Sequence, residues 1–228
     1  MTTETKFWKK KYFTMLAGQS VSLITSGILQ MSIIFYLTAK TNSAMVLSIA
    51  TLMGFLPQAV IGPFAGTFVD RHSRKGVMIG ADLMIAATGG FLAVVSVFME
   101  LPIWLIMLVL FVRSIGNAFH SPASSAVTPL MVPQDQLTKC AGYNQTMQAA
   151  VSLISPAAAA FLYSVWSLST IILLDIIGAV LACGVVAVLS IPNPPICPGE
   201  SQNSFFRDMK EGYFELKKNK GLFALLWI

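Results

Sequence analysis

Six long apolar stretches dominate the sequence, and short polar segments separate them. A helix needs about 20 consecutive apolar residues to cross the hydrocarbon core of a bilayer, and every one of these stretches reaches that length. The pattern therefore predicts an all-α membrane protein built on a bundle of six transmembrane helices. We expect the spans at Phe13–Leu37, Ala44–Val69, Val77–Met99, Pro102–Pro129, Thr138–Val165 and Leu168–Ile191.

The pattern changes after the sixth span. Four prolines within Ile191–Gly199 exclude a regular helix there. Ser204 then stands where it can cap a short helix from about Phe205 to Lys218, which has one apolar and one charged face. We interpret it as an amphipathic helix on the inner membrane surface, the alternative being a solvated linker. The sequence thus predicts three parts: a six-helix bundle over 1–191, a cytoplasmic central loop over 192–220, and the start of a truncated seventh transmembrane helix over 221–228.

Composition excludes several classes of protein. Only 11% of the residues are charged and 55% are hydrophobic, whereas soluble domains carry about a quarter charged residues. The net charge of +5 sits beside the apolar stretches and forms no basic face, so nucleic acid is not an expected partner. The three cysteines form no CxxC or Cys/His cluster, so we expect no metal site and no cofactor. No hydrolase, metalloprotease or phosphate-loop motif is present, and an enzyme is therefore not expected.

The placement of lysine and arginine predicts the orientation in the membrane. Loops on the cytoplasmic side carry an excess of these residues. If the N-terminus is cytoplasmic, the outer loops hold only Lys40 and the inner segments hold thirteen basic residues: Lys6, Lys9, Lys10, Lys11, Arg71, Arg74, Lys75, Lys139, Arg207, Lys210, Lys217, Lys218 and Lys220. We therefore predict a multi-pass protein of the cell membrane with a cytoplasmic N-terminus.

The loop between the second and third spans has the spacing G-x-x-x-D-R-x-x-R-K, formed by Gly66, Asp70, Arg71, Arg74 and Lys75. Glycine allows two helices to approach closely. The carboxylate of Asp70 can pair with a nearby arginine or face a helix N-terminus. We interpret the five residues as a conformational latch that closes in one state and opens in another. The alternative is an ordinary basic loop on the cytoplasmic side.

Three charged residues lie inside predicted spans, where a charge is costly and usually functional. They are Arg113 in the fourth span, Asp82 in the third and Asp175 in the sixth. Arg113 has either a transport role or a structural role in a buried charge pair. Asp82 is expected to pair with Arg71, Arg74 or Arg113. Either acid is a candidate for proton coupling, and a purely structural, hydrogen-bonded acid is the equal alternative.

Polar residues recur at helical spacing in the first, fourth and fifth spans. Polar groups facing lipid would lack hydrogen-bond partners, so such stripes should face the protein interior or water. We predict a substrate cavity between these helices, with hydrogen bonding inside a dry bundle as the alternative. The stripes comprise Gln19, Ser22, Ser26 and Gln30, then Arg113, Asn117, His120 and Ser124, then Asn144, Gln148, Ser152 and Ser155. Our cavity candidates among them are Gln19, Ser26, Gln30, Asn117, Asn144 and Gln148.

Three of these motifs resemble signatures of the major facilitator superfamily. The loop after the second span resembles its cytoplasmic signature G-x-x-x-D-R-x-G-R-R/K, with Ser73 in place of the usual glycine. Arg113-Ser-Ile-Gly116 is similar to its fourth-helix arginine motif, with the glycine one place early. The fifth span resembles the antiporter motif G-P-x-x-G-G, with small residues for the glycines, at Ser155, Pro156, Ala159 and Ala160.

Longer stretches resemble bacterial macrolide-efflux (Mef-type) transporters of that superfamily. They are Ala17–Ser26, Gly54–Pro57, Arg113–His120 and Gln136–Tyr143. The resemblance implies twelve helices in two six-helix halves, of which this chain is similar to the first and the start of the second. It also implies an antiporter that exports amphipathic drugs such as macrolides, driven by the proton gradient, and so confers antibiotic resistance.

An importer or exchanger of another small solute is the alternative. The expected partners are membrane lipid, a small-molecule substrate such as a macrolide, protons and a C-terminal half. Assistance by an ATP-driven transporter is left open by the sequence. We expect no transport by the chain alone, because one half lacks the bundle that would face it across an alternating-access site.

Overall fold

The computed structural model describes residues 3–191. Within them, six α-helices are long and apolar enough to cross a membrane, and this confirms the expected all-α membrane fold. The predicted central loop at 192–220 and seventh helix at 221–228 lie outside the described residues, so the division into three parts stays a prediction. The helices are α1 (Thr3–Thr41), α2 (Ala44–Arg71), α3 (Arg74–Phe98), α4 (Ile103–Met131), α5 (Leu137–Val165) and α6 (Leu168–Val188), with a 3₁₀ turn at Gln134–Gln136 before α5.

Serine residues mark the start of three helices. The side chains of Ser43, Ser73 and Ser167 each accept a hydrogen bond from a backbone N–H three residues later, at the N-termini of α2, α3 and α6. Such caps satisfy one of the N–H groups that a helix leaves unpaired at its first turn. Helix α1 begins ten residues before the predicted span, because its polar first turns continue the helix beyond the apolar stretch.

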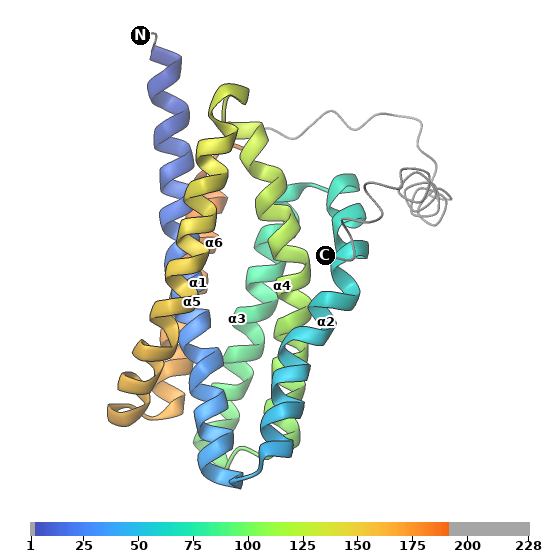
Figure 1. Ribbon diagram of the computed structural model, residues 1–228, viewed down its shortest axis with the longest axis vertical. Helices are drawn as coiled ribbons and strands as arrows, with labels where there is room; N and C mark the ends of the chain where they lie inside the picture. The colour runs from blue at the N-terminus through green and yellow to red at the C-terminus, as the bar shows by residue number, and fades with distance from the viewer. Residues whose placement is uncertain (1–2, 192–228) are drawn as a thin grey trace. The chain divides into compact units, whose positions relative to one another are not determined.

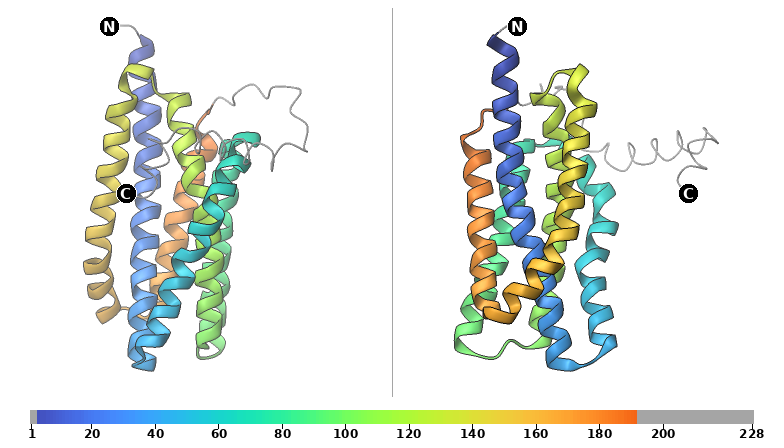
Figure 2. Two further views of the ribbon diagram at one scale, coloured as in Figure 1. Left: turned by 45° about the vertical axis from the view of Figure 1, so that its right-hand side comes forward. Right: turned by 60° about the vertical axis from the view of Figure 1, so that its left-hand side comes forward.

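The helices run up and down, and successive connections alternate between the two ends of the bundle (Figure 1). The N-terminus of α1, the α2–α3 and α4–α5 connections and the end of α6 share one end. In packing, α4 lies against α2 and α3, α6 lies against α1 and α3, and α5 lies against α1. Helices α4 and α5 touch only slightly. Figure 2 shows α5 at the left margin of the bundle in its left view and α2 at the right margin of the helices in its right view. The bundle is therefore open between α5 and α4.

The interior is layered along the helices. One apolar cluster, at the end that carries the N-terminus, includes Tyr12, Met78 and Val127. A second, towards the other end, includes Ile33 and Leu110. Most buried polar side chains lie between these clusters in the sequence of each helix: Gln19, Ser22 and Thr25 on α1, Asp82 on α3, Arg113, Ser114 and His120 on α4, Ser155 on α5 and Asp175 on α6. A polar layer thus crosses the middle of the bundle.

A proline in α2 is matched by a polar group on its neighbour. Pro57 lies inside α2 and lacks the N–H that a helix interior uses. One residue on, the backbone N–H of Gln58 donates to the hydroxyl of Ser114 on α4 at 3.2 Å. Side chains of neighbouring helices commonly satisfy backbone groups that a proline frees inside a membrane. The contact helps to hold α2 against α4 at the level of the polar layer.

Close packing of α1 and α6 at Gly178 gives a testable prediction. A Cβ at Gly178 would lie 3.1 Å from the Cβ of Thr25 and nearer still to its hydroxyl, whereas a Cβ at Gly184 meets no described atom within 4 Å. We expect Gly178→Ala to lower the free energy of unfolding by about 1–3 kcal/mol, because overpacking displaces α1 from α6.

Gly184→Ala, on the same helix, is the matched control. It should leave stability unchanged or raise it by up to about 1 kcal/mol, because alanine favours the helix. Unfolding by a denaturing detergent in mixed micelles, followed by tryptophan fluorescence, measures both. Equal effects of the two substitutions would contradict the packing described.

Candidate functional site

A cavity of about 400 Å³ lies at the polar layer between α1, α2, α4 and α5. All six residues predicted to line a substrate cavity line it, namely Gln19, Ser26, Gln30, Asn117, Asn144 and Gln148. Apolar side chains, among them Leu16, Leu23, Phe55 and Val151, complete the wall. Amides and hydroxyls set among apolar surfaces suit a ligand that has both kinds of surface. Whether substrate binds here stays a prediction.

The sequence predicted a cavity formed by the first, fourth and fifth spans, but a fourth helix also lines it. Helix α2 also contributes, through Gly54, Phe55 and Gln58. A methyl group at Gly54 would lie 2.7 Å from the side-chain nitrogen of Gln30, so glycine there makes room for this amide. The second span carries no polar stripe, and sequence spacing gave no signal of its part in the wall. Conversely, Ser22, Ser152 and Ser155 of the predicted stripes do not line the cavity.

Arg113 forms a buried ion pair with Asp175. Its Nη1 atom donates to Asp175 Oδ2 at 2.7 Å, and the side chains are 4% and 0% exposed. The hydroxyl of Ser26 donates to the other carboxylate oxygen at 2.7 Å. The network joins α4, α6 and α1. Arg113 and Ser26 also line the cavity, so the pair forms part of its closed side.

Within residues 3–191, Asp82 pairs with none of the three arginines expected for it, and this expectation is wrong. Its partner is His120, whose Nε2 atom lies 3.4 Å from Asp82 Oδ1 with both side chains buried. The reason is the register of α3 against α4. Asp82 lies level with His120, whereas Arg113 lies two turns away along α4 and is paired with Asp175. Sequence analysis gave His120 no partner, because the pairing depends on which helices are neighbours.

The predicted latch residues lie at the end of α2 and the start of α3. Arg74 Nη2 is 3.8 Å from Asp70 Oδ1, and the Asp70 side chain is 70% exposed. Lys75 instead donates to the backbone carbonyls of Ala187 and Leu189 at the end of α6, at 2.7 and 2.9 Å. A cation there also complements the negative end of the α6 dipole. The α3 side of the loop is therefore fixed to α6, while the contact to Asp70 is loose.

Gly66 does not have the role expected of it. No atom of the described residues lies within 4 Å of a Cβ built at this position, so it allows no close helix approach within this bundle. Helices α2 and α3 touch only slightly, because α2 packs on α4 instead. Arg71, the remaining predicted latch residue, ends α2.

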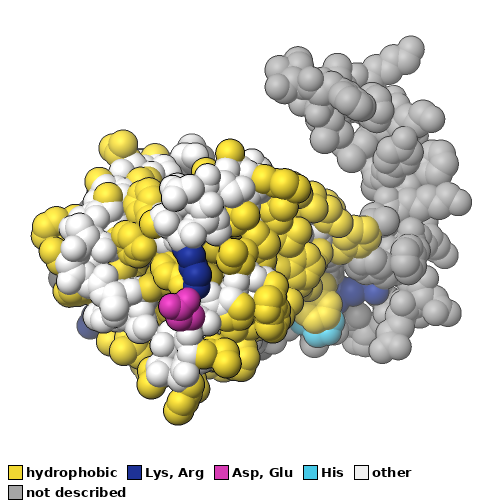
Figure 3. All heavy atoms as spheres, turned by 90° about the horizontal axis from the view of Figure 1, so that it is seen from below, with side chains coloured by type: hydrophobic (Ala, Val, Ile, Leu, Met, Phe, Trp, Pro, Cys, Tyr) yellow, Lys and Arg dark blue, Asp and Glu magenta, His cyan; other side chains and the backbone are white. Residues whose placement is uncertain are grey.

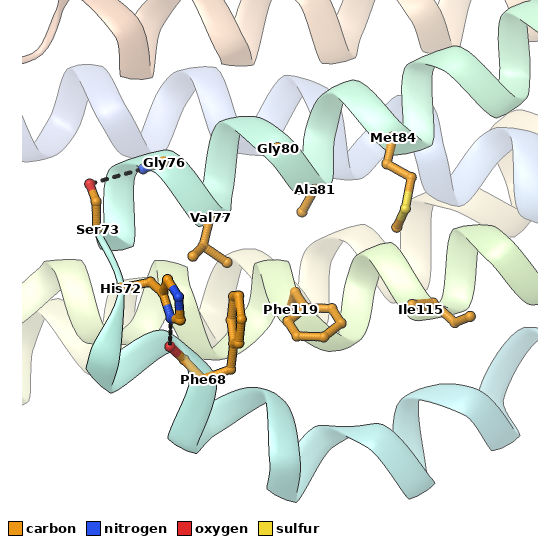
Figure 4. A pocket seen from close by; sticks show the side chains of 10 residues that line it. All are labelled: Phe68, His72, Ser73, Gly76, Val77, Gly80, Ala81, Met84, Ile115 and Phe119. Atoms are coloured by element: carbon orange, nitrogen blue, oxygen red, sulfur yellow. Dashed lines mark hydrogen bonds between the residues drawn. The ribbon is translucent and has the colours of Figure 1, made fainter. Parts of the chain in front are cut away.

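A second hollow, of about 500 Å³, lies beside this loop between α2, α3 and α4. Figure 4 shows the ring of His72 against that of Phe68, with Phe119 nearby and Ser73 capping α3. The two stacked rings have centroids 3.9 Å apart. The hollow is otherwise lined by glycine and apolar side chains. It offers few groups that could orient a polar ligand, so the cavity at the polar layer is the better candidate.

The antiporter-like motif of α5 divides between two faces. Ser155 and Ala159 are buried and, one turn apart, face α1. A Cβ at Gly27 of α1 would lie 2.9 Å from the Cβ of Ser155, so small residues on both helices permit a close approach. Pro156 is half-buried and Ala160 is exposed. The motif therefore serves at least the packing of α5 on α1, and an antiport role stays a prediction.

Comparison with known families decides the classification. Residues 15–228 match the family model described as Major Facilitator Superfamily. The chain belongs to this superfamily. It is accordingly a multi-pass membrane protein, and the expected membership in this superfamily is confirmed.

Similar proteins narrow the comparison within the superfamily. Macrolide efflux protein A of Streptococcus pyogenes is 59% identical over 221 residues, which are 97% of this chain and 55% of that protein. Macrolide efflux protein A of Enterococcus faecalis is 56% identical over 187 residues, 82% of this chain and 58% of that protein. The uncharacterized MFS-type transporter YkuC of Bacillus subtilis is 25% identical over 224 residues, 95% of this chain and 51% of that protein. The chain thus spans about half the length of the curated relatives it matches.

Cysteine labelling tests whether the cavity of this superfamily member contains water. In the full chain in lipid vesicles, with its three native cysteines replaced, we expect Gln148→Cys to react severalfold faster with a charged, membrane-impermeant thiol reagent than Leu153→Cys. Gln148 lines the cavity, whereas Leu153 on the same helix is 79% exposed on a surface that we expect to face lipid. Only a hydrated thiol forms the reactive thiolate readily. Equal labelling of the two positions would contradict a water-filled cavity.

Proposed function

We propose that this chain is the N-terminal half of a transporter that exports amphipathic drugs, macrolides first, in exchange for protons. The observation that carries the proposal is the cavity at the polar layer, which combines amides and hydroxyls with apolar walls inside a membrane bundle. The substrate class is taken from two relatives named macrolide efflux protein A, at 56–59% identity. A partner half is proposed because the chain spans about half of their length.

The charge distribution supports a cytoplasmic N-terminus. The end that carries the N-terminus also carries Lys9, Lys10, Lys11, Arg71, Arg74, Lys75 and Lys139 in the described residues. Figure 3 looks onto the opposite end, where charged side chains are sparse among hydrophobic and uncharged ones. There Lys40 is engaged by Glu100 at 3.4 Å. Basic residues favour the cytoplasmic side, so we place the α2–α3 loop inside the cell.

In this proposal the open side of the cavity faces the second six-helix half. The slight contact between α4 and α5 leaves the cavity without a wall there, and a facing bundle would supply it. Rocking of one bundle against the other then exposes the cavity to alternate sides of the membrane. The asymmetric latch suits such a motion, because Lys75 stays with α6 while Asp70 is free to exchange partners.

Drug accumulation tests the proposal. The chain, fused to the C-terminal remainder of the S. pyogenes relative, should make a sensitive bacterium accumulate severalfold less labelled macrolide, and collapse of the proton gradient should abolish the difference. The chain expressed alone should behave like empty vector. Higher accumulation with the fusion would indicate import, and export that survives loss of the gradient would rule out proton coupling.

Asp70→Asn tests the latch. The Asp70–Arg74 contact is exposed and long, so we expect the substitution to change the free energy of unfolding by less than about 1 kcal/mol. Export by the fusion should nevertheless fall severalfold, because the closed state loses an interaction that the open state lacks. Glu100→Gln, which removes the exposed carboxylate of the Lys40–Glu100 pair at the opposite end, is the matched control and should leave export unchanged. A stable Asp70→Asn fusion with normal export would refute the latch.

A further inference from the structure

We propose that Asp82 and His120 form a proton-binding site in the wall of the cavity, and that protons enter the transport cycle there and not at Arg113–Asp175. The inference rests on the proposed function for its role in export. The site itself is a property of the six-helix bundle and is tested separately. Its ligand is a single proton.

The first observation is the burial of two groups that can both change their charge. The side chains of His120 and Asp82 are 11% and 5% exposed, and 3.4 Å separates His120 Nε2 from Asp82 Oδ1. Histidine is the side chain whose charge normally changes near neutral pH. A carboxylate this close to an imidazole couples the protonation of the two groups.

The second observation is a set of buried polar atoms without hydrogen-bond partners among the described residues. They are Asp82 Oδ2, His120 Nε2 and both side-chain amide atoms of Gln19. Buried polar groups are nearly always paired, and leaving one unpaired costs about 1–3 kcal/mol. These three side chains come from three helices and lie in one layer. Their unpaired atoms can accept or donate further hydrogen bonds, so the site can take up a proton or a water molecule.

The third observation is a route from the cavity. His120 and Gln19 line it, whereas Asp82 does not. A proton arriving from the cavity therefore meets the imidazole first and the carboxylate behind it. With Asp82 ionised and His120 neutral the pair has a charge of −1. Uptake of one proton brings it to zero, as an N–H bond on His120 or an O–H bond on Asp82.

The neighbouring charges distinguish this site from the other buried acid. Asp175 receives donors on both carboxylate oxygens, from Arg113 and Ser26, and arginine keeps its proton. Among the described residues, Asp82 faces the imidazole of His120 and the neutral amide of Gln19, and no arginine. The other titratable groups that bear on it are Asp175 and Cys183, both on α6, while α1 presents the neutral Gln19. A change of charge at Asp82 and His120 therefore leaves the ion pair intact.

Gln19 links the proton site to the cavity. Its amide lies in the cavity wall and interacts with Asp82, although it forms no hydrogen bond of good geometry among the described residues. Towards an ionised carboxylate the amide can only donate, whereas towards a protonated one it can also accept. Protonation thus changes how Gln19 is oriented, and with it the groups that the cavity offers to substrate.

Histidine NMR on the full 228-residue chain in lipid nanodiscs tests the site. The chain has two histidines, His72 and His120, so ring-labelled protein gives two sets of signals. Asp82→Asn should change the pH response of the His120 ring signals, because a neighbouring carboxylate at 3.4 Å is removed. His72, in the α2–α3 loop, should not respond and also reports that the variant is folded.

Two results would overturn the site: a His120 signal that does not titrate in the wild type, or a pH response unchanged by Asp82→Asn in a folded variant. Its role in export is tested in the fusion, where Asp82→Asn and His120→Gln should each abolish proton-driven export. If export is proton-driven but survives both variants, the inference fails while the proposed function stands. If the NMR change is present but export needs no proton gradient, the proposed function fails while the site stands.

Discussion

The ion pair between Arg113 and Asp175 is the constraint on which the rest of the bundle depends. A charge at this depth is very costly without a partner, and removing one member of a buried pair typically costs about 3–5 kcal/mol. The pair therefore fixes the height and rotation of α4 relative to α6. Because Ser26 holds the second oxygen of Asp175, α1 is fixed at the same level, and α6 packs against both α1 and α3.

The polar layer is the consequence of that constraint. Once Arg113 is placed, the side chains one and two turns along α4, Asn117 and His120, must lie at the level of Gln19 and Asp82 on the neighbouring helices. The two clusters at either end are mostly apolar, so most buried polar side chains gather in the layer between them. The ion pair closes the side of the layer towards α6. The opposite side, where α5 barely contacts α4, remains open as a cavity.

Features that are determined within a single helix could be predicted from the sequence. Spans followed from apolar length, and the residues that line the cavity followed from the spacing of Gln30, Asn117 or Gln148 along single helices. Features that depend on helix neighbours were not predictable. The pairing of Asp82 with His120 needs the register of α3 on α4, and the empty space at Gly66 needs the knowledge that α2 packs on α4 and not on α3. The fold was thus accessible from composition, and the contacts of the site were not.

The two buried acids, Asp82 and Asp175, lie in one layer but differ in how readily their neighbours allow them to change charge. Asp175 cannot change its charge without leaving Arg113 unpaired and loosening three helices. Asp82 has an oxygen with no protein partner and a neighbour, His120, whose own charge is variable. A change of protonation at Asp82 therefore leaves the Arg113–Asp175 pair in place and alters only the contact with His120 between α3 and α4. If the proposed proton site is correct, the bundle separates two tasks: the Arg113–Asp175 pair holds the helices together, and the Asp82–His120 pair changes its charge during transport.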